Sequence, residues 1–337
     1  MTSMTRRAFG ALAAATMLTG VSAASAEPIK VGILSLVSHS PSIIAEGKGY
    51  FKEQGLDVEF VPFQAAQPMA VAIASGDVDF GVTAMTGGLI SLAEKGAVKI
   101  IGGALQETPE IDGQKIIVSK AAFESGVTTP KQLAGKRFGI TTAGSSFHYM
   151  ANKIADKEGF ARSAMQLVPL NAVPAVIASL KSGQIDAWSI VPNIAAGLTK
   201  GGEIHEIGKV SDYIDNYQVT TVFTSSDNVA NNRKLVEQYL AALSKGIADY
   251  NAAFVDKTMA ADDTKAIVGM IHKYVYSDRP IEAADPAIRA GAMRINQGAR
   301  LNVGSVKDQL EWFKSEKLVP AEASMEKLVD TSFVETF

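Results

Sequence analysis

An internal repeat is the feature that most constrains the fold of this chain. The stretch VAIASGDVDFGVTAMTGG returns in related form as VIASLKSGQIDAWSIVPN. Gly76 and Asp79 of the first copy lie 107 residues before Gly183 and Asp186 of the second. Two copies of one plan predict two structural units of the same architecture. The same offset joins Gly32-Ile33 to Gly139-Ile140 and Val61-Pro62 to Val168-Pro169.

Each copy of the repeat predicts strands that alternate with helices. In the first copy, IKVGILSL, LDVEFVPF and DVDFGVTA have the pattern of strands, and residues 41–50 and 68–74 have the pattern of helices. Such alternation produces mostly parallel sheets with helices on both faces. We expect Gly76 and Gly183 to end a helix in the left-handed conformation. The predicted fold class is therefore α/β, with two doubly wound lobes.

The first 26 residues predict an export signal peptide. Paired arginines are followed by an apolar run and by Ala-Ser-Ala, which fits a small-x-small cleavage site. The run is shorter than the ~20 apolar residues of a membrane-spanning helix. The segment TRRAF resembles the twin-arginine signal, which would export the protein folded. Residues 1–26 are therefore set apart from the fold, and the mature protein is expected outside the cytoplasm.

Charge and cysteine content exclude several functions. The chain has 32 basic and 35 acidic residues, and removal of Arg6 and Arg7 with the signal leaves 30 against 35, a net charge of −5. A mildly acidic chain without basic runs is a poor candidate for binding nucleic acid or anionic membranes. With no cysteine, lipoprotein anchoring, thiolate catalysis and cysteine-ligated zinc are excluded. We expect a free, soluble monomer.

Several segments resemble a known family. The segments AEGKGYFKEQGLDVEFV, AIASGDVDFGVTA and TPKQLAGKRFGITTAGSS, with the export segment, resemble the nitrate/sulfonate/taurine type of periplasmic solute-binding protein of ABC importers. The resemblance covers essentially all of residues 27–337, and its superfamily also contains binders of thiamin-pyrimidine precursors and of aromatic acids. It implies a type II periplasmic binding protein fold, in which two α/β lobes joined by two crossing strands close over a ligand. It also implies a location in the periplasm and a partner complex of an ABC permease and its ATPase.

This plan predicts how the chain is divided between the lobes. Residues 27–113 and 221–337 are assigned to lobe one, and residues 114–220 to lobe two. The crossing strands are expected near residues 116 and 220, with hinge bending at residues 106–116 and 217–224. The mostly helical segment from residue 231 onward is assigned to lobe one, and Trp312 on its last long helix is expected in the core.

The repeat also predicts where a ligand would bind. In open parallel sheets, ligands lie beyond the carboxyl ends of the strands, where helix N-termini offer unpaired N–H groups. The 107-residue offset pairs the loops at these ends across the cleft. Ser145 and Ser146, which follow the predicted strand GITTA, either donate hydrogen bonds to an anion or cap the next helix. His39 either donates a hydrogen bond to the ligand or has a structural role. Trp188 either stacks on a planar ligand or lies in the core. The candidate ligand-binding residues are Ser38, His39, Ser40, Gln64, Thr86, Ser145, Ser146, Phe147, Trp188 and Asn193.

No pattern in the sequence indicates catalysis, a cofactor or a metal site. The four histidines have no metal-ligand spacing, and there is no G-x-S-x-G elbow, P-loop or dinucleotide fingerprint. Two kinds of enzyme with this lobe plan, the eukaryotic pyrimidine synthases of thiamin biosynthesis and the porphobilinogen deaminases, need cysteines that this chain lacks. The sequence therefore favours a binding protein over an enzyme.

The ligand class stays open at this stage. Few arginines or lysines lie in the predicted cleft loops, which disfavours a dianion such as phosphate. Hydroxyl and amide groups suit a monoanion such as an alkanesulfonate, taurine or nitrate. The apolar neighbours Met69, Met85, Phe147 and Trp188 leave room for an aromatic acid or a pyrimidine. We therefore expect a small organic anion, with an aromatic acid, a thiamin-precursor pyrimidine or an enzyme substrate as alternatives.

Overall fold

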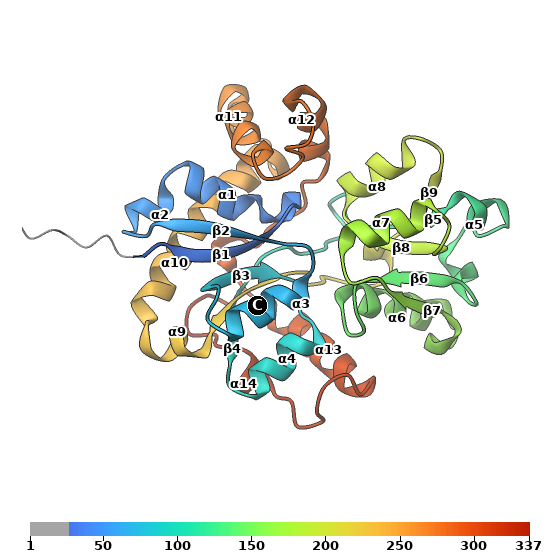
Figure 1. Ribbon diagram of the computed structural model, residues 1–337, viewed down its shortest axis with the longest axis horizontal. Helices are drawn as coiled ribbons and strands as arrows, with labels where there is room; N and C mark the ends of the chain where they lie inside the picture. Colours follow the sequence, from blue (N-terminus) through green and yellow to red (C-terminus); the bar gives the residue numbers. More distant parts are fainter. Residues whose placement is uncertain (1–26) are drawn as a thin grey trace, which may run out of the picture.

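Two five-stranded sheets form the two lobes of the molecule (Figure 1). The computed structural model describes residues 27–337, so the predicted signal peptide, residues 1–26, lies outside the described residues. Both sheets have the same strand order, and in each the fourth strand of the order is antiparallel to its neighbours while the other pairs are parallel. The first sheet has the order β2 (Val58–Phe63), β1 (Ile29–Leu34), β3 (Phe80–Thr83), β10 (Thr221–Ser225), β4 (Val98–Gly103), and the second β7 (Gln166–Pro169), β6 (Arg137–Ile140), β8 (Ala187–Ile190), β5 (Lys115–Ser119), β9 (Ile204–Lys209).

The repeated glycines of the first strands permit close helix packing. A Cβ atom at Gly32 of β1 would lie 2.8 Å from Cγ of Met69, on the helix after β2. A Cβ atom at Gly139 of β6 would lie 2.8 Å from Cγ1 of Val176, on the helix after β7. Both members of the second pair follow their counterparts by 107 residues. The repeat thus preserves a strand–helix contact in each lobe.

In each copy, the repeated aspartate directly precedes the third strand and accepts a hydrogen bond from the backbone of the first strand. The Lys30 amide donates to Asp79 Oδ2 at 2.7 Å, and the Arg137 amide donates to Asp186 Oδ2 at 2.8 Å. The glycine of each preceding Ser-Gly pair has a positive φ, 82° in the first copy and 72° in the second. The predicted left-handed helix ends are therefore confirmed. The glycine and aspartate of the repeated segment have structural roles in both lobes.

Helices alternate with strands along the chain in both lobes, as the sequence pattern predicts. The α/β class with two lobes is confirmed. Lobe one has α1 (Ser40–Gly47), α2 (Tyr50–Glu53), α3 (Ala66–Ala74), α4 (Gly87–Glu94) and α9 (Ser226–Asn231), and lobe two has α5 (Lys120–Glu124), α6 (Ser146–Glu158), α7 (Val173–Lys181) and α8 (Pro192–Thr199).

The C-terminal helices extend lobe one toward the cleft. Helix α10 (Arg233–Tyr250) packs against α1, and α11 (Ala261–His272) also contacts α1. Helix α12 (Ile281–Ala290) additionally contacts α8 of lobe two across the top of the cleft (Figure 1). Helix α13 (Val303–Ser315) is followed by α14 (Met325–Leu328). Trp312 is 4% exposed, so the predicted core position of this side chain is confirmed.

Two chain segments, residues 104–114 and 210–220, pass between the lobes and touch each other. Gln106 and Gln218 form an isolated antiparallel bridge. The Gln218 side chain donates to the backbone oxygens of Leu105 and Thr220, and its Oε1 accepts from Asn296 Nδ2 at 2.9 Å. A fully buried amide therefore ties both crossing segments together. Within residues 27–337, no helix is long and apolar enough to cross a membrane.

Candidate ligand-binding cleft

A cavity of about 70 Å³ lies between the lobes at the carboxyl ends of the strands. Its walls come from the loops after β1, β2 and β3, from the matching loops after β6, β7 and β8, and from both crossing segments. The lobes touch around it: the Gly87 amide donates to Gly144 O at 3.0 Å, and the Val173 amide donates to Gln64 O at 3.2 Å. We call this space the inner cavity; its lining includes Ser38, His39, Ala65, Thr83, Leu105, Gln114, Thr141, Ser145, Ser146, Phe147, Val191 and Thr220.

The N-terminus of α6 opens onto the inner cavity. Ser145 is the N-cap residue, but its side chain makes no capping hydrogen bond. Its hydroxyl is buried and has no hydrogen-bond partner among residues 27–337. The first N–H groups of a helix also lack intrahelical partners and carry partial positive charge. Ser145, Ser146 and Phe147 therefore offer hydrogen-bond donors that suit an anionic group.

His39 lines the same cavity as a neutral donor. The Leu34 amide donates to His39 Nδ1 at 3.4 Å, so the neutral ring carries its proton on Nε2. Burial lowers the pKa of His39 to about 4, because the surroundings disfavour the charged form. At neutral pH this side chain therefore contributes hydrogen bonding without positive charge.

Among residues 27–337, no charged side chain lines the inner cavity. Glu107 has a buried carboxyl group that accepts hydrogen bonds from Gln114, a residue of the lining. The Gln114 amide donates to Glu107 Oε1 at 3.2 Å, and its Nε2 donates to Oε2 at 3.1 Å. Burial raises the pKa of Glu107 to about 7. Any selectivity at the inner cavity must come from hydroxyls, amides, backbone N–H groups and the imidazole.

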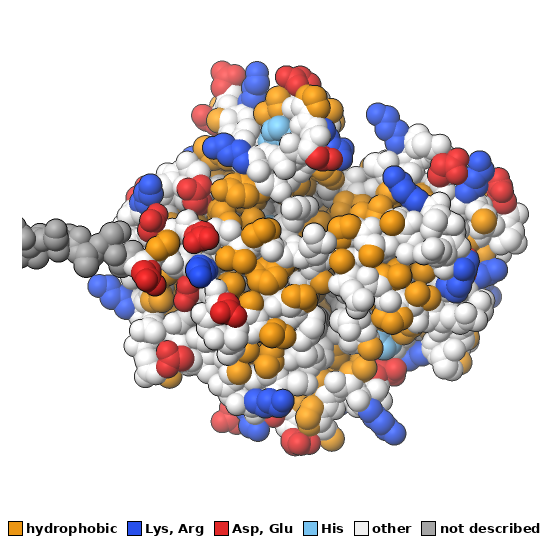
Figure 2. Space-filling view, in the orientation of Figure 1, with side chains coloured by type: hydrophobic (Ala, Val, Ile, Leu, Met, Phe, Trp, Pro, Cys, Tyr) orange, Lys and Arg blue, Asp and Glu red, His pale blue; other side chains and the backbone are white. Residues whose placement is uncertain are grey.

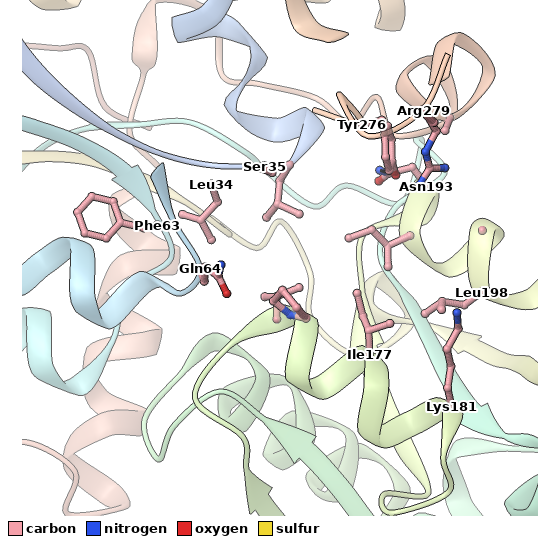
Figure 3. A pocket seen from close by; sticks show the side chains of 16 residues that line it. Leu34, Ser35, Phe63, Gln64, Ile177, Lys181, Asn193, Leu198, Tyr276 and Arg279 are labelled. Atoms are coloured by element: carbon pink, nitrogen blue, oxygen red, sulfur yellow. Dashed lines mark hydrogen bonds between the residues drawn. The ribbon is translucent and has the colours of Figure 1, made fainter. Parts of the chain in front are cut away.

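A second space of about 420 Å³, the outer cavity, opens beside the inner one (Figure 3). The two share Leu34, Leu36 and Val173 in their walls, so they are adjacent spaces at the junction of the lobes. Hydrophobic side chains gather along the junction between the lobes on the face shown in Figure 2. The outer lining also includes Phe63, Gln64, Ile177, Lys181, Asn193, Ile194, Leu198, Tyr276, Arg279 and Ala287.

Most of the candidate residues predicted from the sequence line this cleft. Ser38, His39, Ser145, Ser146 and Phe147 lie on the inner cavity, where the loops paired by the repeat face each other. Gln64 and Asn193 lie on the outer cavity instead.

Three candidates do not line either cavity. Thr86 is the N-cap of α4: its Oγ1 accepts from the Leu89 amide and donates to Gln67 Oε1 at 2.6 Å. Ser40 is fully buried in the first turn of α1. Trp188 is fully buried on β8 and packs behind Phe147, with 5.3 Å between ring centroids. Met69 and Met85, expected near the ligand, belong to the hydrophobic core.

Several cleft residues were missed by sequence reasoning. Gln114 and Thr220 lie on the crossing segments. The rule that ligands bind beyond the carboxyl ends of parallel strands does not predict a role for these segments. Tyr276 and Arg279 come from the connection between α11 and α12, which has no counterpart in the repeat. Lys181 ends α7, and nothing in the sequence distinguishes it from other exposed lysines. The two cations of the outer cavity, Lys181 and Arg279, thus come from segments outside the cleft loops predicted from the sequence.

Two α/β lobes joined by two crossing segments around a cleft of this size define the periplasmic binding protein class of fold. The chain belongs to the NMT1/THI5-like family, whose model matches residues 37–253. A Brucella abortus (strain 2308) protein that carries the provisional name of a binding protein is 26% identical over 246 residues, which are 72% of this chain and 73% of that protein.

Two further comparisons agree with this fold. The taurine-binding periplasmic protein of Escherichia coli (strain K12) is 24% identical over 180 residues, 53% of each chain. The structure of an alkanesulfonate-binding protein from Xanthomonas axonopodis pv. citri, bound to MOPS, matches with a TM-score of 0.70 at 18% identity. That match covers 92% of this chain and 100% of the other chain.

Proposed function

We propose that this protein is the periplasmic solute receptor of an ABC importer and that the inner cavity binds the acidic group of a small organic anion. The observation that carries the proposal is the buried, unpartnered Ser145 hydroxyl at the N-terminus of α6, inside a cavity between two lobes. The predicted export signal and the names of the taurine and alkanesulfonate binders among the similar proteins support the same assignment.

The donors of the inner cavity favour a singly charged sulfonate or carboxylate. Both oxygen-rich groups accept several hydrogen bonds at once, which the α6 N-terminus, Ser145 and the Nε2–H of His39 would donate. Within the described residues, the inner lining has no carboxylate that would repel an anion and no lysine or arginine that would favour a second negative charge.

Ligand capture would couple to closure of the lobes. Bending at residues 104–114 and 210–220 would separate the two sides of the inner cavity, because each side belongs to a different lobe. A ligand that contacts both sides binds the closed form better and shifts the population toward it. Small-angle scattering tests this step: the true ligand is expected to make the protein more compact, and an unchanged radius of gyration would contradict closure.

An enzyme on this fold is the competing function. A receptor releases its ligand chemically unchanged, whereas an enzyme converts it. Mass spectrometry of the bound molecule after long incubation with the protein distinguishes the two, because recovery of a product would replace the receptor assignment with catalysis.

The receptor proposal predicts a thermal shift by one class of anion. A ligand at ~100 times its Kd adds about 2.7 kcal/mol to the free energy of unfolding, which raises the Tm by about 5 °C. The panel is alkanesulfonates, taurine, nitrate, aromatic carboxylates and pyrimidines with residues 27–337. No shift with any of these compounds would contradict the proposed ligand class.

Ser145→Ala is expected to weaken binding of that ligand 10- to 100-fold, since a hydrogen bond to a charged group contributes about 1.5 to 3 kcal/mol. Its Tm without ligand should change little, because the hydroxyl makes no capping bond. Ser119→Ala is the matched control: this N-cap of α5 accepts from the Ala122 amide, so its loss should cost about 1 kcal/mol of stability and leave affinity unchanged. Calorimetric titration and denaturation of both variants test the assignment, and equal affinities would remove Ser145 from the site.

A further inference from the structure

The outer cavity is much larger than the acidic group of a small anion requires. The inner cavity, at about 70 Å³, holds only a few atoms, whereas the outer cavity, at about 420 Å³, falls in the size range of cavities that enclose whole organic ligands. Because the two cavities share the wall formed by Leu34, Leu36 and Val173, a molecule bound by its acidic group at α6 extends into the outer cavity when the lobes part at the contact between Val173 and Gln64. The side chains that line the outer cavity therefore determine the size and polarity of the rest of the ligand.

Apolar side chains form the body of the outer cavity. Leu34, Leu36 and Phe63 come from lobe one, while Ile177 and Leu198 come from α7 and α8 of lobe two. Figure 3 shows Leu34 on one side of the space and Ile177 and Leu198 on the other. Such walls stabilise an aliphatic or aromatic segment by removing its surface from water.

A buried amide at the edge of the outer cavity has an unused hydrogen-bonding atom. Asn193 is 3% exposed, and its Nδ2 donates to the Tyr276 hydroxyl at 2.6 Å. Its Oδ1 has no hydrogen-bond partner among residues 27–337. Reversing the amide would exchange the roles of the two atoms and still leave one of them without a partner. In the orientation shown the free atom is an acceptor and does not pair with an anionic group; only the reversed amide presents Nδ2 as a donor to one.

Two cations lie at the same cavity, and no carboxylate of the described part of the chain lines it. Lys181 forms no ion pair with any residue of the described chain. Arg279 has one carboxylate neighbour, the exposed Asp278 at 3.5 Å, and its guanidinium lies 4.4 Å from the centroid of the Tyr276 ring. Figure 3 shows Arg279, Asn193 and Tyr276 together at one edge, with Lys181 at the end of α7. Arg279 therefore makes one edge of the outer cavity positively charged, and Lys181 adds a second cation at a separate place on its rim.

We propose that the outer cavity is a subsite for a second anionic group, so that the ligand is an elongated acid with an apolar or aromatic body and negative charge at both ends. The proposal rests on the receptor function and specifies its substrate class. The inner donors bind one end, the apolar walls bury the body, and the cations Lys181 and Arg279 bind the other end.

Matched pairs of acids test the subsite. The probes are hexanoate against adipate, octanoate against suberate, and benzenesulfonate against 4-sulfobenzoate, titrated by calorimetry into residues 27–337 at 50 mM and 500 mM NaCl. The second acidic group is expected to tighten binding three- to tenfold in at least one pair at low salt, which is the gain that exposed cations provide. That gain should shrink at high salt, because solvent-exposed charges are screened.

Variants assign the gain to the named residues. In the double variant Lys181→Ala/Arg279→Ala, the ratio of the two affinities should approach one, while Lys200→Ala, which removes an exposed lysine outside the lining, should keep the wild-type ratio. If monoanions bind and the second acid adds nothing in any pair, the subsite proposal is wrong and the receptor function stands. If no mono- or dianion binds, the proposed function fails as well. A gain that persists in the double variant would also overturn the assignment.

Discussion

Replacing Gly246 with alanine is expected to lower the free energy of unfolding by about 2 to 4 kcal/mol. Gly246 lies in the C-terminal half of α10, where this helix packs against α1. A Cβ atom there would lie 2.1 Å from the backbone oxygen of Pro41 and 3.1 Å from Cβ of Ala45. The backbone of α1 cannot turn aside as a flexible side chain would, so the two helices must separate. Overpacking of this kind costs about 1 to 3 kcal/mol in ordinary cores, and a clash with backbone lies at the upper end.

The sign of this effect is opposite to that of the ordinary substitution. Glycine in a helix interior is less favourable than alanine by about 0.5 to 1 kcal/mol, so an unhindered site gains stability. Gly269 in α11 is the matched control, because a Cβ atom there would meet nothing within 4 Å. Denaturant unfolding should show Gly269→Ala at or above wild-type stability and Gly246→Ala well below it. Equal midpoints for the two variants would show that α10 and α1 adjust without cost.

The repeat predicts the fold because the same short-range contacts stabilise both copies. Gly32 with Met69 and Gly139 with Val176 are equivalent contacts, and each copy closes with an aspartate that binds the start of its first strand. These interactions join residues within about fifty positions of each other, so their pattern can be read along the chain. The antiparallel strands β5 and β10 depend instead on contacts between distant segments.

The candidate site likewise contains residues that the sequence pattern predicts and residues that depend on tertiary contacts. Ser38, His39 and Ser145 to Phe147 could be predicted because a general rule places ligands at the carboxyl ends of parallel strands. Tyr276 and Arg279 reach the cleft only because α12 crosses over to α8, a tertiary contact with no local sequence signal. Thr86 and Trp188 lie near strand ends as well, but capping of α4 and packing against Phe147 use their side chains.

Glu107 gives the protein a pH-dependent stability with a definite sign. The carboxyl group is fully buried in the first crossing segment, and the Glu107 amide donates to Tyr217 O of the second at 2.8 Å. Burial raises its pKa from 4.5 to about 7, despite hydrogen bonds from Gln114 and the charge of Lys115, and Asp112 adds to the rise. Between these two pH values, the folded chain holds a proton that the unfolded chain has lost. The free energy of unfolding therefore falls as pH rises from 4.5 to 7, by about 3 kcal/mol from this group.

His39 acts in the opposite direction over part of the same range. Its pKa is lowered from 6.5 to about 4, so the unfolded chain binds the extra proton between these values and stability rises with pH. Between pH 4.5 and 6.5 the two contributions to the free energy of unfolding have opposite signs. The pH dependence of the wild-type protein therefore reveals neither of them separately. A variant that removes only the Glu107 ionisation separates them.

Glu107→Gln is expected to match the wild type near pH 5 and to be more stable at pH 8 by about 2 to 3 kcal/mol. Glutamine resembles the protonated carboxyl group in shape and keeps an acceptor for Gln114, but it cannot ionise. The measurement is denaturant unfolding of both proteins in half-unit steps from pH 5 to 8, with Glu326→Gln as the control because this carboxylate is exposed. The difference between Glu107→Gln and wild type should grow with pH and level off above 7. Parallel stability curves would mean that Glu107 is already ionised at pH 5 and that its charge is stabilised where the two crossing segments meet.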